Sequence, residues 1–298
     1  MGIQLVRYYL IKEASRFVSP SITSTIKLDN QSFFRYALFF DASDYYKLLN
    51  PFKTDRYGIS TLIKGPKFAD FLKECMENAY YHSSSEEKFF CYTLFMSYVI
   101  NNNYQPFIEA FTPKKKKSVY VEKMLNSYYF NSNENMPITK MNLADYFFDS
   151  FALSESDINL IDKPLKRVFG FFCAKNYYDE CYKNAKFYFN HFTKDFLGIK
   201  KITFNLYDFF LNHRKNKLKA RHFLYHKKID TTVLNLKKEV YNNGVSDVNH
   251  SVDELYNRTL KDLKVACDVL NNYFNFNQDL KAFDKYFNIP KNKERSNS

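Results

Sequence analysis

The sequence predicts an all-α protein built as a single large helical bundle. Gly occurs six times and Pro eight times in 298 residues, and folds made of many short strands need more of both residues at their turns. Apolar residues recur at helical spacing in most segments of the chain. They make up 45% of the residues, which is enough to bury a sizeable core and excludes a disordered protein.

About ten helices follow from this spacing. The clearest covers 250–274, where an apolar stripe follows the capping-box pattern of Ser251 and Glu254. A second capping-box pattern, Ser84 with Glu87, precedes a helix that is apolar on nearly every face, and such a helix belongs at the centre of a bundle. The expected helices cover 3–17, 32–41, 66–81, 86–103, 117–130, 140–151, 155–172, 176–195, 203–225 and 250–274, with a short one over 278–286.

The segments between these helices contain no convincing domain linker. Loops are expected over 49–65, 104–116, 131–139 and 242–249. ITFNLY at 202–207 is the only candidate strand, and we expect it to begin a helix instead. The sequence therefore predicts one helical domain over 1–289, followed by a polar tail over 290–298 that frays.

Cysteine usage and hydropathy both indicate a cytoplasmic protein. The five cysteines are widely spaced and lie mostly in apolar surroundings, as buried side chains in a reducing compartment do. The N-terminal segment carries Arg7 and Lys12 and lacks the cleavage site of a signal peptide. No uncharged run reaches the roughly 18 residues that a transmembrane helix needs.

The chain is strongly basic, with a net charge of +12. Such a charge attracts polyanions, either nucleic acid or an anionic lipid surface, although a merely solvated surface explains it equally well. Two basic runs are candidate phosphate contacts, with Phe223 and Tyr225 placed to stack on bases. The candidate residues are Lys114, Lys115, Lys116, Lys117, Arg214, Lys215, Lys217, Lys219, Arg221, His222 and His226. The spacing of His222 and His226 also suits a metal ion, but the lysines and arginine around them would repel it.

A polar stripe runs along the apolar central helix. Thr93, Ser97, Asn101 and Gln105 follow one another at intervals of four residues, so the helical members share one face. Buried polar groups need partners, so the stripe faces either a polar cavity or an internal hydrogen-bond network. Pro106 disfavours the helical conformation at Gln105, and we expect the helix to end there.

This stretch resembles the central helix of the bacterial zinc-dependent phospholipase C-like hydrolases, an all-α family with the phospholipase C/P1 nuclease-like fold. The family pattern is H-x-x-x-D-x-x-x-H-P, followed by H-x-x-x-E. Here the chain reads SYVINNNYQP and then SVYVE, which keeps the spacing, Pro106 and Glu122. The four other ligand positions are occupied by Ser97, Asn101, Gln105 and Ser118.

Other segments are similar to the family in the same order along the chain. They include RYYLIKEA, GISTLIKGPKFADF and the stretch that begins DTTVLNLKKEV. YALFFDASDYY is similar to the family segment that ends in Gly-Pro-Asp, and the resemblance places Asp44 at a ligand position. The resemblance thus covers most of the chain.

The resemblance implies a multi-zinc site that has lost most of its ligands. Asp44 and Glu122 remain, but Ser, Asn and Gln are poor ligands for zinc, which binds thiolate, imidazole or carboxylate. We therefore expect a pseudoenzyme without a cofactor, which binds through the former active-site cleft or the basic surface. One alternative is an active phosphoester hydrolase with a reduced zinc site at Asp44 and Glu122. Another is a nucleic-acid-binding or membrane-surface protein in which the cleft plays no part.

Overall fold

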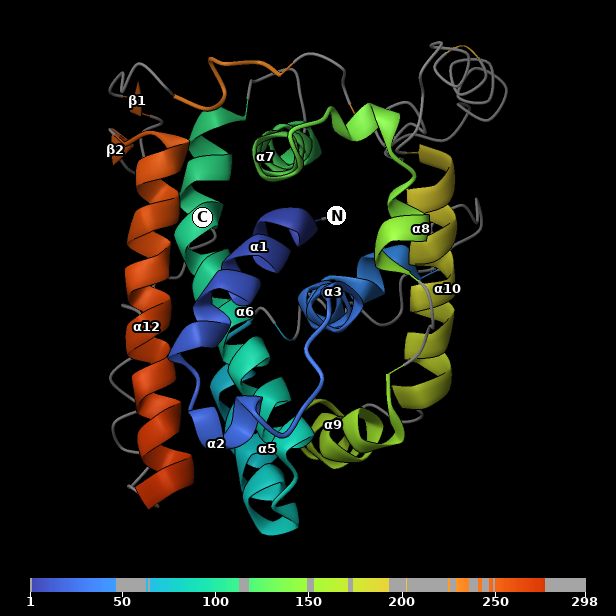
Figure 1. The fold of residues 1–298 in the computed structure, drawn as a ribbon, viewed down its shortest axis with the longest axis vertical. Helices are drawn as coiled ribbons and strands as arrows, with labels where there is room; N and C mark the ends of the chain where they lie inside the picture. Colours follow the sequence, from blue (N-terminus) through green and yellow to red (C-terminus); the bar gives the residue numbers. More distant parts are fainter. Residues whose placement is uncertain are drawn as a thin grey trace, which may run out of the picture.

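The computed structural model has the all-α fold that the sequence predicts (Figure 1). It describes residues 2–46, 63, 65–112, 118–148, 153–170, 174–192, 202, 225, 229–235, 241–242, 247–248 and 250–276. The α-helices are α1 (Gln4–Ala14), α2 (Pro20–Thr23), α3 (Asn30–Phe39), α5 (Phe68–His82), α6 (Ser85–Phe111), α7 (Ser118–Glu134), α8 (Leu143–Phe147), α9 (Glu155–Phe169), α10 (Ala174–Phe192) and α12 (Val252–Phe276). Three short 3₁₀ helices are η1 (Ser15–Phe17), η2 (Ala42–Tyr45) and η3 (Ile138–Lys140).

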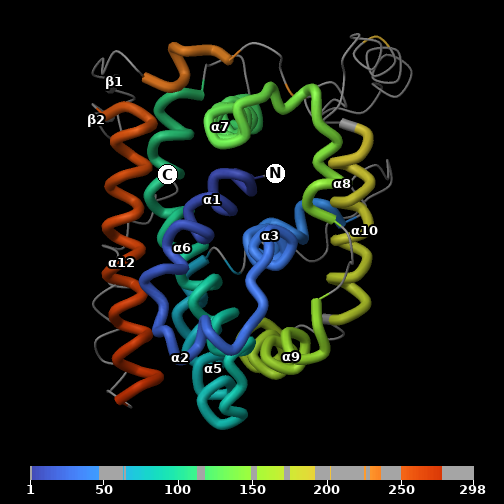
Figure 2. The backbone as a smooth tube through the Cα atoms, in the orientation of Figure 1, coloured from blue at the N-terminus to red at the C-terminus, as the bar shows by residue number. Residues whose placement is uncertain are grey.

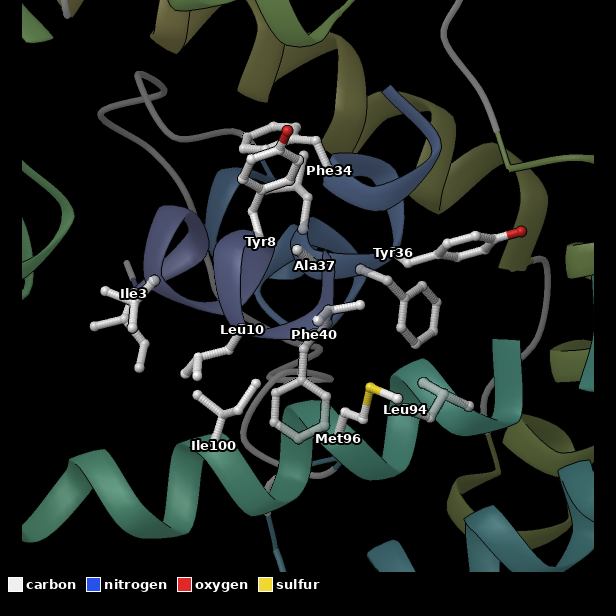
Figure 3. Close-up of a cluster of buried hydrophobic side chains, with 14 of the residues drawn as sticks. Ile3, Tyr8, Leu10, Phe34, Tyr36, Ala37, Phe40, Leu94, Met96 and Ile100 are labelled. Carbon is white, nitrogen blue, oxygen red and sulfur yellow. The ribbon is translucent and has the colours of Figure 1, made fainter. Parts of the chain in front are cut away.

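Helix α6 lies at the centre of the bundle, as its uniform hydrophobicity predicts. Phe90, Leu94 and Tyr98 follow one face of the helix and are all buried, and Phe89, Tyr92 and Phe95 on its other faces are buried as well. Helix α12 packs along α6 in the opposite direction (Figures 1 and 2). On another side, α1 and α3 pack against α6, where Phe40 reaches down between Met96 and Ile100 (Figure 3). Nearly all of the buried apolar side chains among the described residues form one continuous cluster.

The sequence signals for helix starts are largely confirmed. At α12, the Ser251 hydroxyl accepts from the Glu254 amide (3.3 Å) and the Glu254 carboxylate accepts from the Ser251 amide (3.0 Å), which completes the expected capping box. At α6 only half of the box forms, because Glu87 accepts from Ser156 instead of reaching back to Ser84.

The expected end of the central helix is wrong. Helix α6 continues through Pro106 to Phe111, so the loop expected over 104–116 begins later. A proline inside a helix removes one hydrogen bond, to the carbonyl four residues earlier. Asn102 and Pro106 are both exposed, so the unbonded carbonyl group lies on the side of the helix that water reaches. The missing bond is therefore tolerated there.

Other boundaries also differ from the sequence-based expectations. Helix α7 extends to Glu134, into the loop expected over 131–139, and α8 is shorter than the helix expected over 140–151. Within the loop expected over 242–249, the two-residue strands β1 (Tyr241–Asn242) and β2 (Asp247–Val248) pair antiparallel. Most of the helix expected over 203–225, the short helix over 278–286 and the tail over 290–298 lie outside the described residues.

The sequence predicts no transmembrane helix. None of the described helices combines the length and the apolar character that a membrane crossing requires.

Candidate functional site

Asp44 and Glu122 both lie within electrostatic range of the buried phenol of Tyr45. Asp44 directly precedes Tyr45 in η2, whereas Glu122 comes from α7. Burial is the main cause that raises the pKa of Tyr45 well above its usual value, followed by Tyr225 and Asp41, and Asp44 and Glu122 make smaller contributions. Two residues that the family resemblance places at ligand positions therefore lie near one side chain.

The other candidate positions differ in how deeply they are buried. Ser97 is 1% exposed, and its hydroxyl has no hydrogen-bond partner among the described residues. Asn101 follows one turn later and is half-buried. Gln105 is exposed and donates to Glu109 on its own helix (2.7 Å). Ser118, at the start of α7, is exposed as well. The stripe on α6 therefore runs from the core to the surface.

Tyrosine side chains surround Glu122. The rings of Tyr45 and Tyr188 are 5.4 Å apart, and Tyr225 forms a hydrogen bond with Tyr188. All three are buried, and burial raises the pKa of each phenol, with Glu122 adding to each increase. The phenols therefore remain protonated at neutral pH and act as neutral hydrogen-bonding groups.

A buried lysine adjoins the same cluster. Lys123 on α7 is 2% exposed, and its ammonium nitrogen lies 5.4 Å from the centre of the Tyr225 ring. Burial lowers the pKa of Lys123 well below its usual value, and the neighbouring Glu122 opposes this shift. Burial thus disfavours the charged form of the lysine, while the adjacent carboxylate favours it.

The start of α1 adjoins this cluster through Asn126. The Asn126 side-chain oxygen accepts from the amides of Leu5 (3.0 Å) and Val6 (3.4 Å), and its amide group donates to the Gly2 carbonyl (3.1 Å). These bonds satisfy amide groups that the first turn of a helix leaves without a partner. Asn126 also forms a hydrogen bond with Tyr225. It therefore joins α1 to the tyrosines.

Arg7 and Asp41 form a buried ion pair between α1 and the segment after α3. The Arg7 guanidinium donates to the Asp41 carboxylate (2.6 Å) and to the Ala37 carbonyl (3.1 Å). Asp41 also packs directly against Gly2, where a Cβ atom would overlap the carboxylate. Glycine at this position therefore permits the close approach.

Sequence reasoning missed most of these surroundings. Asn126 had a usable signal, since it follows Ser118 and Glu122 at the same four-residue interval. Arg7 served only as an argument against a signal peptide. Tyr225 was expected to stack on nucleic-acid bases, and this expectation is wrong because its ring is buried.

The donor groups of this cluster do not fit a multi-zinc centre. Zinc needs thiolate, imidazole or carboxylate ligands, but the neighbours of Glu122 are protonated phenols and the Lys123 side chain. Asp41, a third carboxylate near Tyr45, is already paired with Arg7. Within the part of the chain that the structure describes, no three His, Cys, Asp or Glu residues are grouped so that they could hold a metal ion. We therefore derive no chemical step through zinc.

The described residues include four of the five cysteines but none of the basic residues that the sequence suggested as phosphate contacts. Cys75, Cys91, Cys181 and Cys267 are buried free thiols, as expected, and Cys173 lies outside the described residues. The basic candidates Lys114, Lys115, Lys116, Lys117, Arg214, Lys215, Lys217, Lys219, Arg221, His222 and His226 also lie outside them.

No protein-family model matches this chain, and no curated protein or solved structure matches it either. The likeness to the phospholipase C-like hydrolases accordingly depends on the spacing of the motifs.

Proposed function

We propose that this protein is a catalytically degenerate, cytoplasmic relative of the zinc-dependent phospholipase C-like hydrolases. In this proposal the helical scaffold persists, and the metal centre has been replaced by neutral hydrogen-bonding groups. The observation that carries the proposal is that Asp44 and Glu122 both act on the pKa of the buried phenol of Tyr45. In this proposal two anionic groups survive at matching positions, and Tyr45, Tyr188 and Tyr225 lie near Glu122.

The chemistry of these groups argues against hydrolysis. In the zinc-dependent family, the metal ions lower the pKa of bound water and so supply hydroxide at neutral pH. Ser97 could act as a nucleophile only with an activating base. Its hydroxyl is buried and bonds to no such group among the described residues.

We propose binding as the surviving role, with a polyanion as the partner. The net charge of +12 supports this choice, because it favours association with nucleic acid or an anionic lipid surface. The free, buried thiols are typical of proteins from a reducing compartment and support the cytoplasmic assignment.

Hydrolysis assays test the proposal against the active-enzyme alternative. Purified protein would be supplied with zinc and incubated with phosphatidylcholine vesicles or with single-stranded DNA. We expect no hydrolysis above the buffer rate, and no difference between the wild type and Glu122→Gln.

The matched control is Glu109→Gln, which alters an exposed carboxylate on α6. Zinc-dependent hydrolysis that a chelator and Glu122→Gln abolish, but Glu109→Gln leaves intact, would establish the active enzyme with a reduced metal site instead.

A further inference from the structure

Helix α10 lies at the edge of the bundle (Figure 1), and it exposes an aromatic ring. The side chain of Phe187 is 45% exposed, although a phenyl ring normally lies in the core. Its ring stacks on that of His191, one turn later, with centroids 4.0 Å apart and an interplanar angle of 24°. His191 also forms a hydrogen bond with the Phe187 carbonyl (2.8 Å), which fixes the geometry of the pair.

The surface around this pair is basic and polar. Lys183 and Lys186 are exposed and lie within one turn of Phe187 on the helix. Between Lys183 and His191, the sequence KNAKFYFNH contains no acidic residue. Asn190 is also exposed; its side-chain oxygen accepts from Asn142 (2.9 Å), and its NH2 group is a hydrogen-bond donor.

We propose that this face of α10, formed by Lys183, Lys186, Phe187, Asn190 and His191, binds single-stranded nucleic acid. A base stacks on the Phe187–His191 pair, and the two lysines contact the phosphates on either side. Such a combination of an aromatic platform with cations is how proteins bind single strands without sequence preference. The inference deepens the polyanion-binding role proposed above and rests on it, but not on the loss of zinc.

A single strand fits this surface better than a membrane does. A helix that lies in a lipid surface buries a broad apolar face. Among the described side chains of α10, Phe187 is the only exposed large hydrophobic one. Its exposed neighbours are Lys183, Lys186, Asn190 and His191, whose side chains are able to donate hydrogen bonds to phosphate groups.

The same ring pair also contributes to the helix itself, because side chains four residues apart stabilise a helix when they stack. If that were its only role, removing the ring would alter thermal stability and leave binding unchanged. Binding and stability must therefore be measured on the same variants.

The test measures the fluorescence anisotropy of a labelled oligothymidylate over a series of salt concentrations. The first variant is Phe187→Leu, and the second is Lys183→Gln with Lys186→Gln. The control is Lys261→Gln with Lys264→Gln on α12, which removes the same charge at the same spacing from another exposed helix face. Thermal denaturation of each variant verifies that it folds.

We expect Phe187→Leu to weaken binding about tenfold, since stacking on one base contributes about 1–3 kcal/mol and each 1.4 kcal/mol is a factor of ten. The double lysine variant should flatten the dependence of log K on log salt by about 1.4, or about 0.7 for each lost phosphate contact. The control should bind as the wild type does.

Three outcomes would overturn the inference. Wild-type binding that both α10 variants retain would exclude this face but leave polyanion binding intact. Binding to phosphatidylserine vesicles without binding to the oligonucleotide would identify a membrane as the partner. Binding to neither probe would contradict the polyanion-binding part of the proposed function as well.

Discussion

The guanidinium group of Arg7 lies 2.6 Å from the carboxylate of Asp41, and both side chains are completely buried. The pair joins α1 to the segment between α3 and η2. The helix η2 follows directly and carries Asp44 and Tyr45. It therefore helps to position one side of the cluster around Tyr45.

Loss of either partner of this pair should destabilise the fold strongly. Arg7→Met or Asp41→Asn leaves the other group buried without its counter-charge, and we expect each to lower the free energy of unfolding by about 3–5 kcal/mol. Urea denaturation measures the change. The double variant Arg7→Met with Asp41→Asn should lose less than the sum of the single losses, since no uncompensated charge remains. Additive losses would contradict this account.

Removal of the Asn126 side chain should release the first turn of α1. We expect Asn126→Ala to cost about 1–3 kcal/mol, because it leaves the buried amides of Leu5 and Val6 without their acceptor. Hydrogen exchange at these two amides should accelerate. Asn133→Ala, an exposed site on the same helix, is the control and should leave their exchange unchanged. Equal protection in both variants would show that Asn126 does not hold the turn.

The buried hydroxyl of Ser97 should contribute nothing to stability. It has no hydrogen-bond partner among the described residues, so Ser97→Ala removes a desolvated polar group without breaking a bond. We expect an unchanged or higher urea midpoint, and the same result for Ser127→Ala, whose hydroxyl is in the same situation. A loss of more than about 1 kcal/mol in Ser97→Ala would reveal a partner for this hydroxyl.

Stability should fall in mild acid because of His250. Burial, with a contribution from Arg258, lowers the pKa of His250 below 6.5, so the folded state favours the neutral ring. The contribution of the neutral His250 ring to the free energy of unfolding is complete above pH 6.5. It is lost as the pH falls through the lower pKa that His250 has in the folded state.

Urea denaturation of the wild type and His250→Gln at about pH 7.5 and about pH 5 isolates this effect. The wild type should lose more stability between the two pH values than the variant does. Equal losses would show that His250 does not contribute to the pH dependence.

Hydrophobic periodicity predicted the helices well but not all of their ends. The apolar circumference of α6 placed it at the centre, where Phe90 and Leu94 are indeed buried. Its continuation past Pro106 escaped prediction, because tolerance of a proline depends on whether the unbonded carbonyl reaches water. That depends on tertiary structure, which a local pattern does not contain.

The candidate site was predictable only where a spacing pattern marked it. Glu122 and Asp44 were singled out by the family resemblance; both act on the pKa of Tyr45, and their role as a site stays a prediction. Tyr188 was not identifiable in a chain with 25 Tyr and 32 Phe, where most rings are expected to fill the core. The Arg7–Asp41 pair joins separate segments, and neither residue has a local signature that indicates its partner.

The zinc content of the native protein tests the central claim most directly. The account predicts no stoichiometric zinc by elemental analysis of protein purified without chelators, because two carboxylates among protonated phenols offer too few ligands. Two or more tightly bound zinc ions per chain, lost on chelation together with phosphodiesterase activity, would contradict the assignment as a pseudoenzyme.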